Sequence, residues 1–168
     1  GMLNDAAFVA RPIGPMHPIL CASPRYIAAH GAPSKLDDLS AHALLQLHVS
    51  GHEQAMPFYV QTRTGGARNM QALQLPGRFV CNDFCRLLQA CVDGVGVAQL
   101  PLPLALAALR EGKLKTFLPD NVPEGWQLFI HYLSRKPLPA RVRAFVDFCI
   151  KQFGGHADLS ADVSTYLA

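Results

Sequence analysis

The sequence predicts an α/β fold, in which strands and helices alternate along the chain. Three observations favour this class. Short apolar runs suited to buried strands recur, segments with apolar residues three and four positions apart separate them, and Gly or Pro stands near most of their ends. The chain has 168 residues, of which 50% are hydrophobic and 16% charged, enough to bury a substantial core. Strands separated by helices indicate a sheet covered by helices.

The first apolar run, residues 17–22, predicts a short buried strand. Ser23 and Pro24 follow it and favour the start of a helix, because the hydroxyl can accept amide hydrogens and Pro suits the first helical position. We expect a second short helix at 37–39 and then another apolar strand within 43–48. Each strand thus leads into a helix or a loop that carries polar residues.

Residues 49–76 have the weakest pattern of the chain. Several Gly and Pro residues punctuate two possible strands, one at 58–62 and one near 73–75. Neither run alternates clearly between apolar and polar positions. We therefore expect an irregular or hairpin excursion from the main sheet.

A clear strand–helix–strand unit follows. Residues 78–81 form its first strand, and either Asn82 or Asp83 can cap the next helix. Residues 95–100 form its second strand, which Pro101 stops. The helix between them places apolar residues at i, i+3, i+4 and i+7, on one face: Phe84, Leu87, Leu88 and Cys91.

The remaining third of the chain repeats the alternation. We expect a helix at 104–111, a strand at 114–118, a strand buried on both faces at 126–133 and a helix at 139–153. Three aromatic residues of the later strand are expected in the core or between lobes: Trp126, Phe129 and Tyr132. The last helix carries one apolar stripe, made of Val142, Phe145, Val146, Cys149 and Phe153.

The charge distribution argues against nucleic-acid binding by this chain itself. Fifteen Lys and Arg against twelve Asp and Glu give a net charge of +3, and the basic residues are scattered singly. No run approaches the ~20 apolar residues that a membrane-spanning helix needs. The first residues also lack a basic start followed by an apolar segment. We therefore expect a cytoplasmic protein with no membrane partner.

Cysteine and histidine spacing predicts no metal and no cofactor. The five cysteines lack the paired CxxC spacing of a zinc site, and most are expected to be reduced core residues. His48 and His52 are four positions apart, but their segment resembles a strand and loop rather than a helix, and no third ligand accompanies them.

Several segments resemble one protein family. Residues 22–42, ASPRYIAAHGAPSKLDDLSAH, are similar to a signature of the effector-binding domain of LysR-type transcriptional regulators. Further matches follow in the family's order: the Asn82-Asp83 turn, Gly94-x-Gly96-Val97 with Leu100-Pro101, LREGKL at 109–114 and RVRAFVDF at 141–148. The resemblance extends over residues 8–153.

The resemblance implies a periplasmic-binding-protein-like (type 2) fold, with two α/β lobes and a small effector between them. On this basis residues 17–125 form a complete lobe II, residues 2–16 and 126–155 form a remnant of lobe I, and residues 156–168 form a tail. It also implies that about 70 residues of lobe I sequence are absent, which fits the size of a small lobe.

Partners follow from the same resemblance and from the exposed remnant. A two-stranded remnant with one helix leaves apolar edges, so we expect a homodimer or a swapped dimer to cover them. Family members contact DNA through a helix-turn-helix domain, which we do not find in this chain. The expected small-molecule partner is an effector.

The predicted effector site lies at the carboxyl ends of strands, where helix N-termini offer free amide donors. We expect three strand ends, at positions 23, 48 and 82, to converge on one hollow. Helix amides and Asn82 would hold a carboxylate of the effector, and Phe84 would supply an apolar wall. The full candidate set is Ser23, His48, Val49, Ser50, Asn82, Asp83, Phe84 and Pro101.

Other interpretations stay open at this point. Ser23, Asn82 and Asp83 could serve only as helix caps, and the chain could be an oligomerising fragment that binds nothing. Peroxide-sensing relatives place a reactive cysteine near this turn, and Cys85 at a helix start could have a lowered pKa. Cys85 and Cys91 lie about 600° apart on a helix, which disfavours a disulfide between them. No Ser–His or paired-carboxylate set stands at the strand ends, so we do not expect an enzyme.

Overall fold

The computed structural model describes residues 8–64, 67–123, 126–133, 138–159, 161 and 163–166. Its strands are β1 (Phe8–Pro15), β2 (Pro18–Ala22), β3 (Leu44–Leu47), β4 (Phe58–Thr64), β5 (Ala67–Leu73), β6 (Phe79–Cys81), β7 (Val97–Pro101), β8 (Lys115–Thr116) and β9 (Gln127–Leu133). Its α-helices are α1 (Pro24–His30), α2 (Phe84–Val92), α3 (Leu102–Arg110) and α4 (Ala140–Phe153). Short 3-10 helices are η1 (Leu36–Ala41), η2 (Pro119–Asn121) and η3 (Val163–Tyr166).

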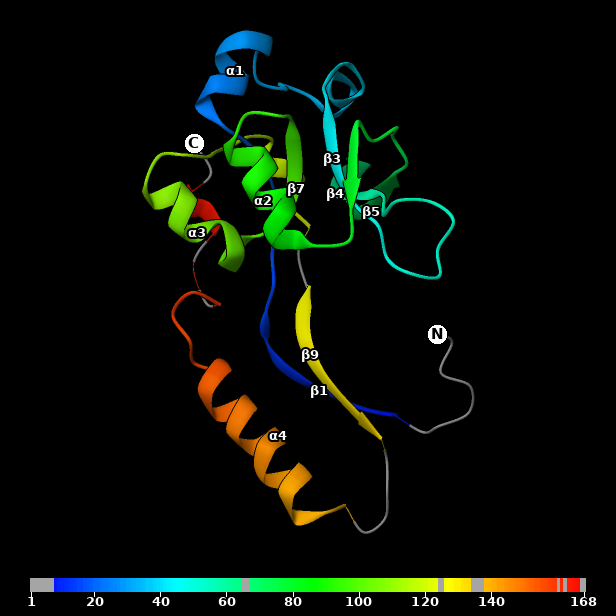
Figure 1. Ribbon diagram of the computed structural model, residues 1–168, viewed down its shortest axis with the longest axis vertical. Coiled ribbons are helices and arrows are strands. Elements are labelled where there is room, and N and C mark those ends of the chain that lie inside the picture. The colour runs from blue at the N-terminus through cyan, green and yellow to red at the C-terminus, as the bar shows by residue number, and fades with distance from the viewer. Residues whose placement is uncertain are drawn as a thin grey trace.

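The larger part of the molecule, which we call the body, comprises the described residues of 17–123. Its five-stranded sheet has the order β6-β3-β7-β2-β8, with helices on both faces (Figure 1). β3 runs parallel to β6 and β7, whereas β2 runs antiparallel to β7 and β8. The carboxyl ends of β3, β6 and β7 therefore meet at one edge of the sheet, and β2 ends at the opposite edge.

All five residues of β2 are buried, because helices cover both faces of the sheet. Side chains alternate along the strand, so Ile19 and Cys21 join the cluster beneath α2 and α3. Leu20 and Ala22 join the second cluster, with Tyr26 of α1 and part of the β4 strand. The prediction of a buried strand at 17–22 is confirmed.

Two predicted helix starts are confirmed, those of α1 and α2, whereas α3 begins at Leu102 rather than at residue 104. The Ser23 hydroxyl accepts a hydrogen bond from the Tyr26 amide at 3.2 Å, as expected for the cap of α1. Asp83, rather than Asn82, caps α2. Gly96 packs so closely on β3 that a Cβ there would overlap the carbonyl of Ala43, which explains a glycine before β7.

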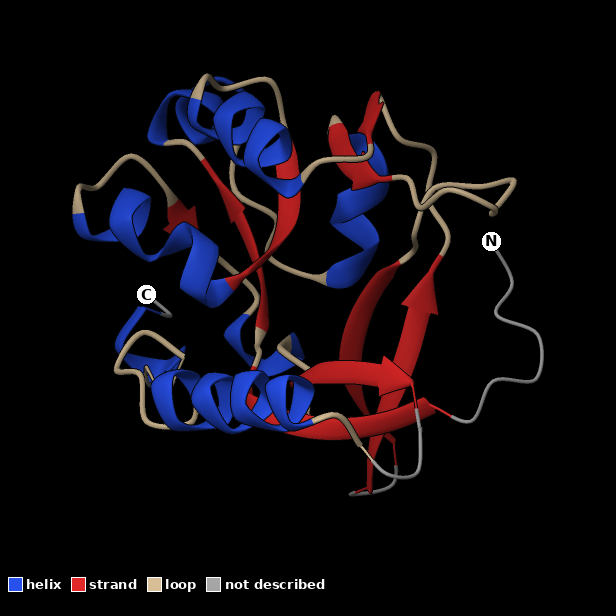
Figure 2. Cartoon of the chain, turned by 60° about the horizontal axis from the view of Figure 1, so that its bottom comes forward, coloured by secondary structure: helices blue, strands red, loops and turns tan. Residues whose placement is uncertain are grey.

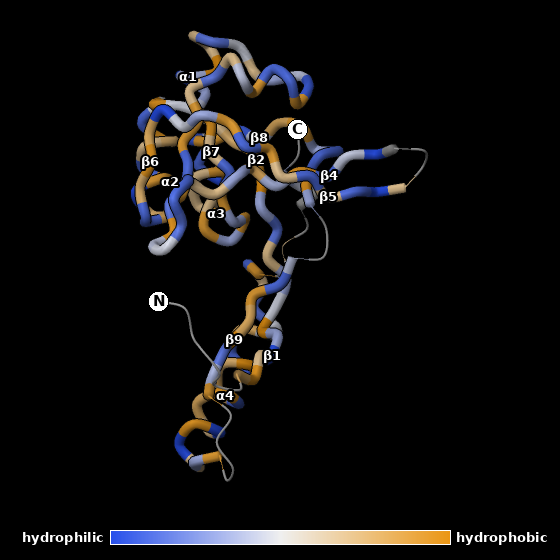
Figure 3. The backbone as a smooth tube through the Cα atoms, turned by 90° about the vertical axis from the view of Figure 1, so that its right-hand side faces the viewer, coloured by the Kyte–Doolittle hydropathy of each residue, from blue (hydrophilic) through white to orange (hydrophobic). Residues whose placement is uncertain are grey.

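The excursion between β3 and β6 is an antiparallel hairpin of β4 and β5 that projects from the five-stranded sheet (Figure 3). β4 is where the sequence predicts a strand. β5 covers residues 67–73 rather than 73–75, because its side chains are almost all exposed and leave no apolar pattern. Pairing with β4, not burial, defines this strand.

The smaller part of the molecule, which we call the arm, comprises β1, β9 and α4. β1 and β9 form an antiparallel ribbon that extends from the body, and α4 packs against β1 on one face (Figures 1 and 2). Val146 and Cys149 of α4 are buried there. The ends of β9 and α4 lie within one residue of the predicted strand at 126–133 and the predicted helix at 139–153.

Two predictions about burial in the arm are wrong. β9 is not buried on both faces: its residues alternate between half-buried and exposed, and Phe129 and Leu133 are 43% and 42% exposed. Phe145 of α4 is 61% exposed, although it belongs to the predicted apolar stripe. Both differences arise because, among the described residues, a single layer covers the ribbon.

Candidate functional site

A cleft opens where the body meets the arm, at the sheet edge where the parallel strands end. Its volume is about 60 Å³, below the several hundred Å³ that enclose a drug-sized ligand, so these residues form a wall rather than a closed cavity. The residues that line it are Met16, Pro18, Leu45, Leu47, Met56, Pro57, Phe58, Tyr59, Phe84, Gln99, Pro101 and Trp126.

Aromatic side chains form the cleft's most distinctive surface. The rings of Tyr59, in β4, and Trp126, just before β9, lie 5.1 Å apart between centroids in a tilted arrangement. Phe84 enters from the first turn of α2. Three segments far apart in the chain thus build one apolar and aromatic wall.

The amide side chain of Gln99 is used within the protein. Its oxygen accepts from the Tyr59 amide at 2.9 Å, and its nitrogen donates to the Tyr59 carbonyl at 2.6 Å. This pair of bonds ties β4 to β7 and fixes the Tyr59 ring over the cleft. Because both ends of the Gln99 amide are occupied, it contributes little hydrogen-bonding capacity for a ligand.

The floor of the cleft is where the chain crosses between body and arm. The Met16 amide donates to the Trp126 carbonyl at 2.9 Å, so the two crossing segments are held together. The cleft therefore lies at a hinge, and any change in the angle between arm and body changes its width.

Five predicted site residues lie at or near this edge of the sheet. Phe84 and Pro101 line the cleft itself. The His48 amide donates to the Cys81 carbonyl at 2.7 Å, which places the ends of β3 and β6, and so Asn82, side by side. Val49 lines a neighbouring open hollow of about 720 Å³ that shares Met56, Pro57 and Tyr59 with the cleft.

Ser50 is exposed in the loop after Val49 and lines neither hollow. Ser23 does not join these residues at all, and the predicted convergence of three strand ends is wrong in this respect. β2 runs antiparallel to β7, so Ser23 lies at the opposite edge of the sheet. Its side chain is 2% exposed, and its hydroxyl caps α1.

The start of α2 differs from the prediction in its chemistry. Asp83 Oδ1 accepts from the amides of Cys85 and Arg86, at 2.7 and 3.1 Å. These donors are therefore not free to hold an effector carboxylate. A second carboxylate here would also meet the negative charge of Asp83.

Most of the cleft residues were not predicted from the sequence. Met16, Met56, Tyr59 and Gln99 were not singled out, and Trp126 was expected in the core or between lobes. Trp126 carried a usable signal, since an aromatic residue at a crossing between lobes can serve as a ligand wall. Tyr59 carried none, because its position depends on the side chain of a residue 40 positions later in the chain.

The cysteines offer one accessible thiol at the site. All five are free; Cys85 is exposed, whereas Cys91, on the inner face of α2, and Cys21, in β2, are buried in one core cluster. A hydrogen bond with Cys91, together with burial, raises the pKa of Cys21, so this thiol stays protonated. Cys85 and Cys91 face different environments, as their helical spacing predicted.

Two further searches cover the part of the chain that the structure describes. No three His, Cys, Asp or Glu side chains gather there as a metal site would require. None of the described helices is both long and apolar enough to cross a membrane.

Comparisons with known proteins identify the family. The family model described as the LysR substrate binding domain matches residues 1–154. The uncharacterized HTH-type transcriptional regulator YhjC of Escherichia coli K12 is 31% identical over 150 residues, 88% of this chain and 48% of YhjC. The HTH-type transcriptional activator AaeR of the same organism is 29% identical over 150 residues, 88% of this chain and 46% of AaeR.

Solved structures agree with this match. The regulatory domain of CrgA, a LysR-type transcriptional regulator from Neisseria meningitidis, superposes with a TM-score of 0.74 at 26% identity, over 92% of this chain and 72% of that one. The regulatory domain of AphB in Vibrio vulnificus gives a TM-score of 0.67 at 29% identity, over 86% and 69%. The predicted α/β, periplasmic-binding-protein-like two-lobe fold is confirmed.

The curated relatives are transcriptional regulators rather than enzymes, and the chain spans about half of their length. The match with the family model covers all of the body and arm. The chain therefore belongs to the LysR substrate-binding-domain family, the effector-binding regulatory domain of LysR-type transcriptional regulators.

Proposed function

We propose that this chain senses a small molecule in the cleft between body and arm and does not transform it. The observation that carries the proposal is the position of the cleft: it lies beyond the carboxyl ends of parallel strands, at a hinge between two lobes. A ligand there would contact both parts and bias the angle between them. Through this change in angle, effector binding in the cytoplasm would alter the other domains of a regulator.

The lining favours an effector with a compact apolar or aromatic body. Phe84, Tyr59 and Trp126 offer ring faces and edges, and the Gln99 amide is already occupied. A carboxylate on the effector remains part of the proposal, but its place is the polar rim rather than the amides of α2. The rim residues are His48 and Asn82, at the ends of β3 and β6.

The lining also supports sensing over catalysis. Among the described residues that form the cleft, none is Ser, Cys, Asp, Glu, His or Lys, and the phenol of Tyr59 is the one group of an acid–base type. General acid–base or nucleophilic catalysis needs such a group in reach of the substrate. The thiol-sensing alternative concerns Cys85, which is exposed but does not line the cleft.

The test is thermal unfolding with four probes at matched concentration: benzoate, cyclohexanecarboxylate, benzyl alcohol and acetate. A ligand at 100 times its Kd stabilises the fold by about 2.7 kcal/mol, so binding raises Tm. We expect benzoate to raise Tm most and acetate least. If benzyl alcohol raised Tm as much as benzoate does, the carboxylate would not be part of the proposed effector.

The matched variants are Phe84→Ala and Phe79→Ala, because both rings are 37% exposed and only Phe84 lines the cleft. We expect Phe84→Ala to reduce the Tm shift and Phe79→Ala to retain it. Equal shifts in the two variants would contradict the site, and no shift with any probe would contradict an apolar carboxylate as effector.

We also propose that the chain associates with a second copy, as a homodimer or swapped dimer. In the described residues, β1 and β9 pair with each other and with no third strand, so their outer edges offer unpaired backbone groups. DNA would be contacted by a helix-turn-helix domain of the whole regulator. Size-exclusion chromatography with light scattering tests the association: a stable monomer at micromolar concentration contradicts it.

A further inference from the structure

The segment after α4, residues 155–166, of which the structure describes 155–159, 161 and 163–166, turns back from the arm to the body. In Figure 1 it climbs from the upper end of α4 to the side of α3, to the left of the two crossing strands. The family match ends at residue 154, so this segment lies beyond the matched domain.

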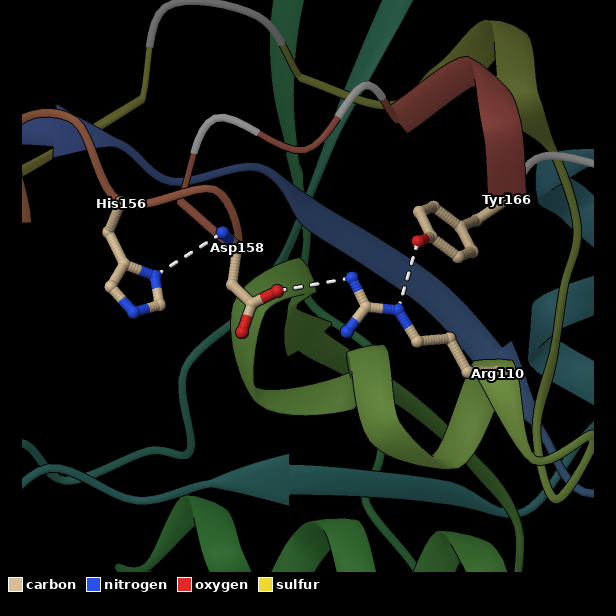
Figure 4. A network of polar contacts seen from close by, with 4 residues as sticks. All are labelled: Arg110, His156, Asp158 and Tyr166. Carbon is tan, nitrogen blue, oxygen red and sulfur yellow. Dashed lines mark hydrogen bonds and ion pairs between the residues drawn. The ribbon is translucent and has the colours of Figure 1, made fainter.

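Arg110, in the last turn of α3, makes the main polar contacts with this segment (Figure 4). Its Nη2 lies 3.1 Å from Asp158 Oδ1, and its Nε donates to the Tyr166 hydroxyl at 3.3 Å. The Asp158 amide in turn donates to His156 Nδ1 at 3.3 Å. The planar guanidinium reaches two acceptors from fixed directions, which a lysine ammonium cannot reproduce.

Tyr166 is held at both of its ends. Its hydroxyl meets Arg110, and its backbone carbonyl accepts from the hydroxyl of Thr116 in β8. Tyr166 and Ala161 also pack against the core cluster under α2 and α3. The far end of the segment is thus joined to the body by polar and apolar contacts together.

The near end of the segment stays in contact with the arm. The Leu159 side chain lies against β1 at Gly14, where a Cβ would sit 3.4 Å from Leu159 Cδ1, an ordinary van der Waals distance. The His156 amide donates to the Phe153 carbonyl of α4 at 3.1 Å. One short segment therefore touches β1, α4, α3 and β8.

These contacts matter because, apart from the segment after α4, the described chain crosses between body and arm only by two adjacent segments. Met16 and Trp126 tie these segments together, so they act as a single hinge. A third connection, which begins on the arm and ends on α3, restricts rotation of the arm relative to the body about that hinge. The cleft lies at the same hinge.

We propose that residues 155–166 are an intramolecular strap, anchored on Arg110, that sets the angle between arm and body and thereby the width of the cleft. Release of the strap frees the hinge. The consequence for effector affinity rests on the proposed function, whereas the mechanical role does not depend on any ligand.

The test measures the distance between arm and body without ligand, by electron spin resonance between two spin labels. One label is on Cys85 of α2, and the other on Ala144→Cys of α4; both sites are exposed, and Cys81→Ser removes the half-buried competing thiol. We expect a narrow distance distribution in this parent. Asp158→Asn and Arg110→Ala should widen it roughly twofold, as for a freed hinge, and deletion of residues 156–168 should widen it further.

The control is Glu111→Gln, which breaks the Lys113–Glu111 ion pair of 2.6 Å. That pair is about as exposed as Arg110–Asp158 but joins near neighbours on the body alone. We expect the distance distribution of Glu111→Gln to match that of the parent. If the distance distribution is as narrow in Asp158→Asn and in the deletion as in the parent, the proposed strap is wrong.

Arg110→Lys separates charge from geometry. Lysine keeps the attraction to Asp158 but loses the bond to Tyr166, so we expect a width between those of the parent and Arg110→Ala. Because these measurements contain no effector, a failure of the effector panel leaves the result on the strap unaffected. A free hinge in the intact parent would also overturn the proposal.

Discussion

The body and the arm are built from similar strands and helices but bury them to different extents. In the body, helices cover the sheet on both faces, and every residue of β2 is buried. In the arm, one helix covers one face of the ribbon, and Val146 and Cys149 are the residues of α4 that reach full burial. The number of covering layers, rather than the hydrophobic content of the segments, accounts for the difference.

The difference shows in which apolar residues remain on the surface. Among the residues that the structure describes, six of the twelve large exposed hydrophobic ones belong to the arm, although it is the smaller part: Phe8, Phe129, Leu133, Phe145, Phe148 and Phe153. A cluster of this kind marks an interaction surface on a soluble protein. The body therefore has a core of its own, whereas the described residues leave much of the apolar surface of the arm uncovered.

The largest expected effect is the contrast between a core substitution in the body and a surface one in the arm. Leu100 is fully buried, so Leu100→Ala should cost roughly 2–5 kcal/mol of unfolding free energy. Phe148 is 57% exposed, so Phe148→Ala should change it by about 0.5 kcal/mol or less in the monomer. Urea denaturation measures both. Equal costs would show that the Phe148 ring is covered, as in a dimer.

A smaller effect is expected in how fast the buried thiols of the arm and of the body react, because local opening exposes them. Cys149 of α4 and Cys91 of α2 are both buried thiols, but only Cys91 lies under several layers. We expect Cys149 to react with a thiol reagent at least about tenfold faster than Cys91, because the arm opens without the body. Pulsed labelling with mass spectrometry measures both, with exposed Cys85 as the fast reference. Equal rates would mean that arm and body open as one unit.

The smallest expected effect is a pH dependence confined to the body. Burial, and to a lesser extent the charge of His30, lowers the pKa of His42 below 6.5. The geometry is compatible with this: the Tyr26 hydroxyl accepts from the Ala43 amide at 2.9 Å and lies 3.2 Å from His42 Nδ1, where its O–H can donate to the nitrogen of a neutral imidazole.

The sign follows from proton binding. With the pKa lowered in the folded state, the unfolded chain binds the proton more readily, so this contribution is present above pH 6.5 and is lost as pH falls through the folded pKa. We expect Tm to fall between pH 7.5 and 5.5, and His42→Gln to reduce that fall, with exposed His52→Gln as control. If Tm falls as much in His42→Gln as in the parent, the pH dependence does not come from His42. If Cys149 is labelled faster in His42→Gln, the effect of His42 is not confined to the body.

Much of the fold could be predicted from the sequence, because local signals carry it. Ser23 and Pro24 predict the start of α1, and the spacing of Leu87 and Cys91 predicts the buried face of α2. β5 could not be predicted, since its exposed residues show no pattern and only its pairing with β4 defines it.

The candidate site was predictable only in part. Phe84 and Pro101 were found because they stand directly at the end of a strand or the start of a helix. Ser23 has the same local pattern but lies at the other edge, because strand direction in a sheet depends on pairing between distant segments. The sequence shows where a strand ends and not which way it runs beside its neighbours.

By itself, the amino-acid sequence determined the helices with their caps, the buried strands of the body and the family to which the chain belongs. Those features depend on residues within a few positions of one another, or on patterns read in order along the chain. Only the tertiary structure decided the direction of β2, the meeting of Tyr59, Phe84 and Trp126 in one cleft, and the contact of the strap with Arg110. Each of these brings together residues tens of positions apart, and their meeting is set by how sheet, hairpin and arm pack in space rather than by any local preference.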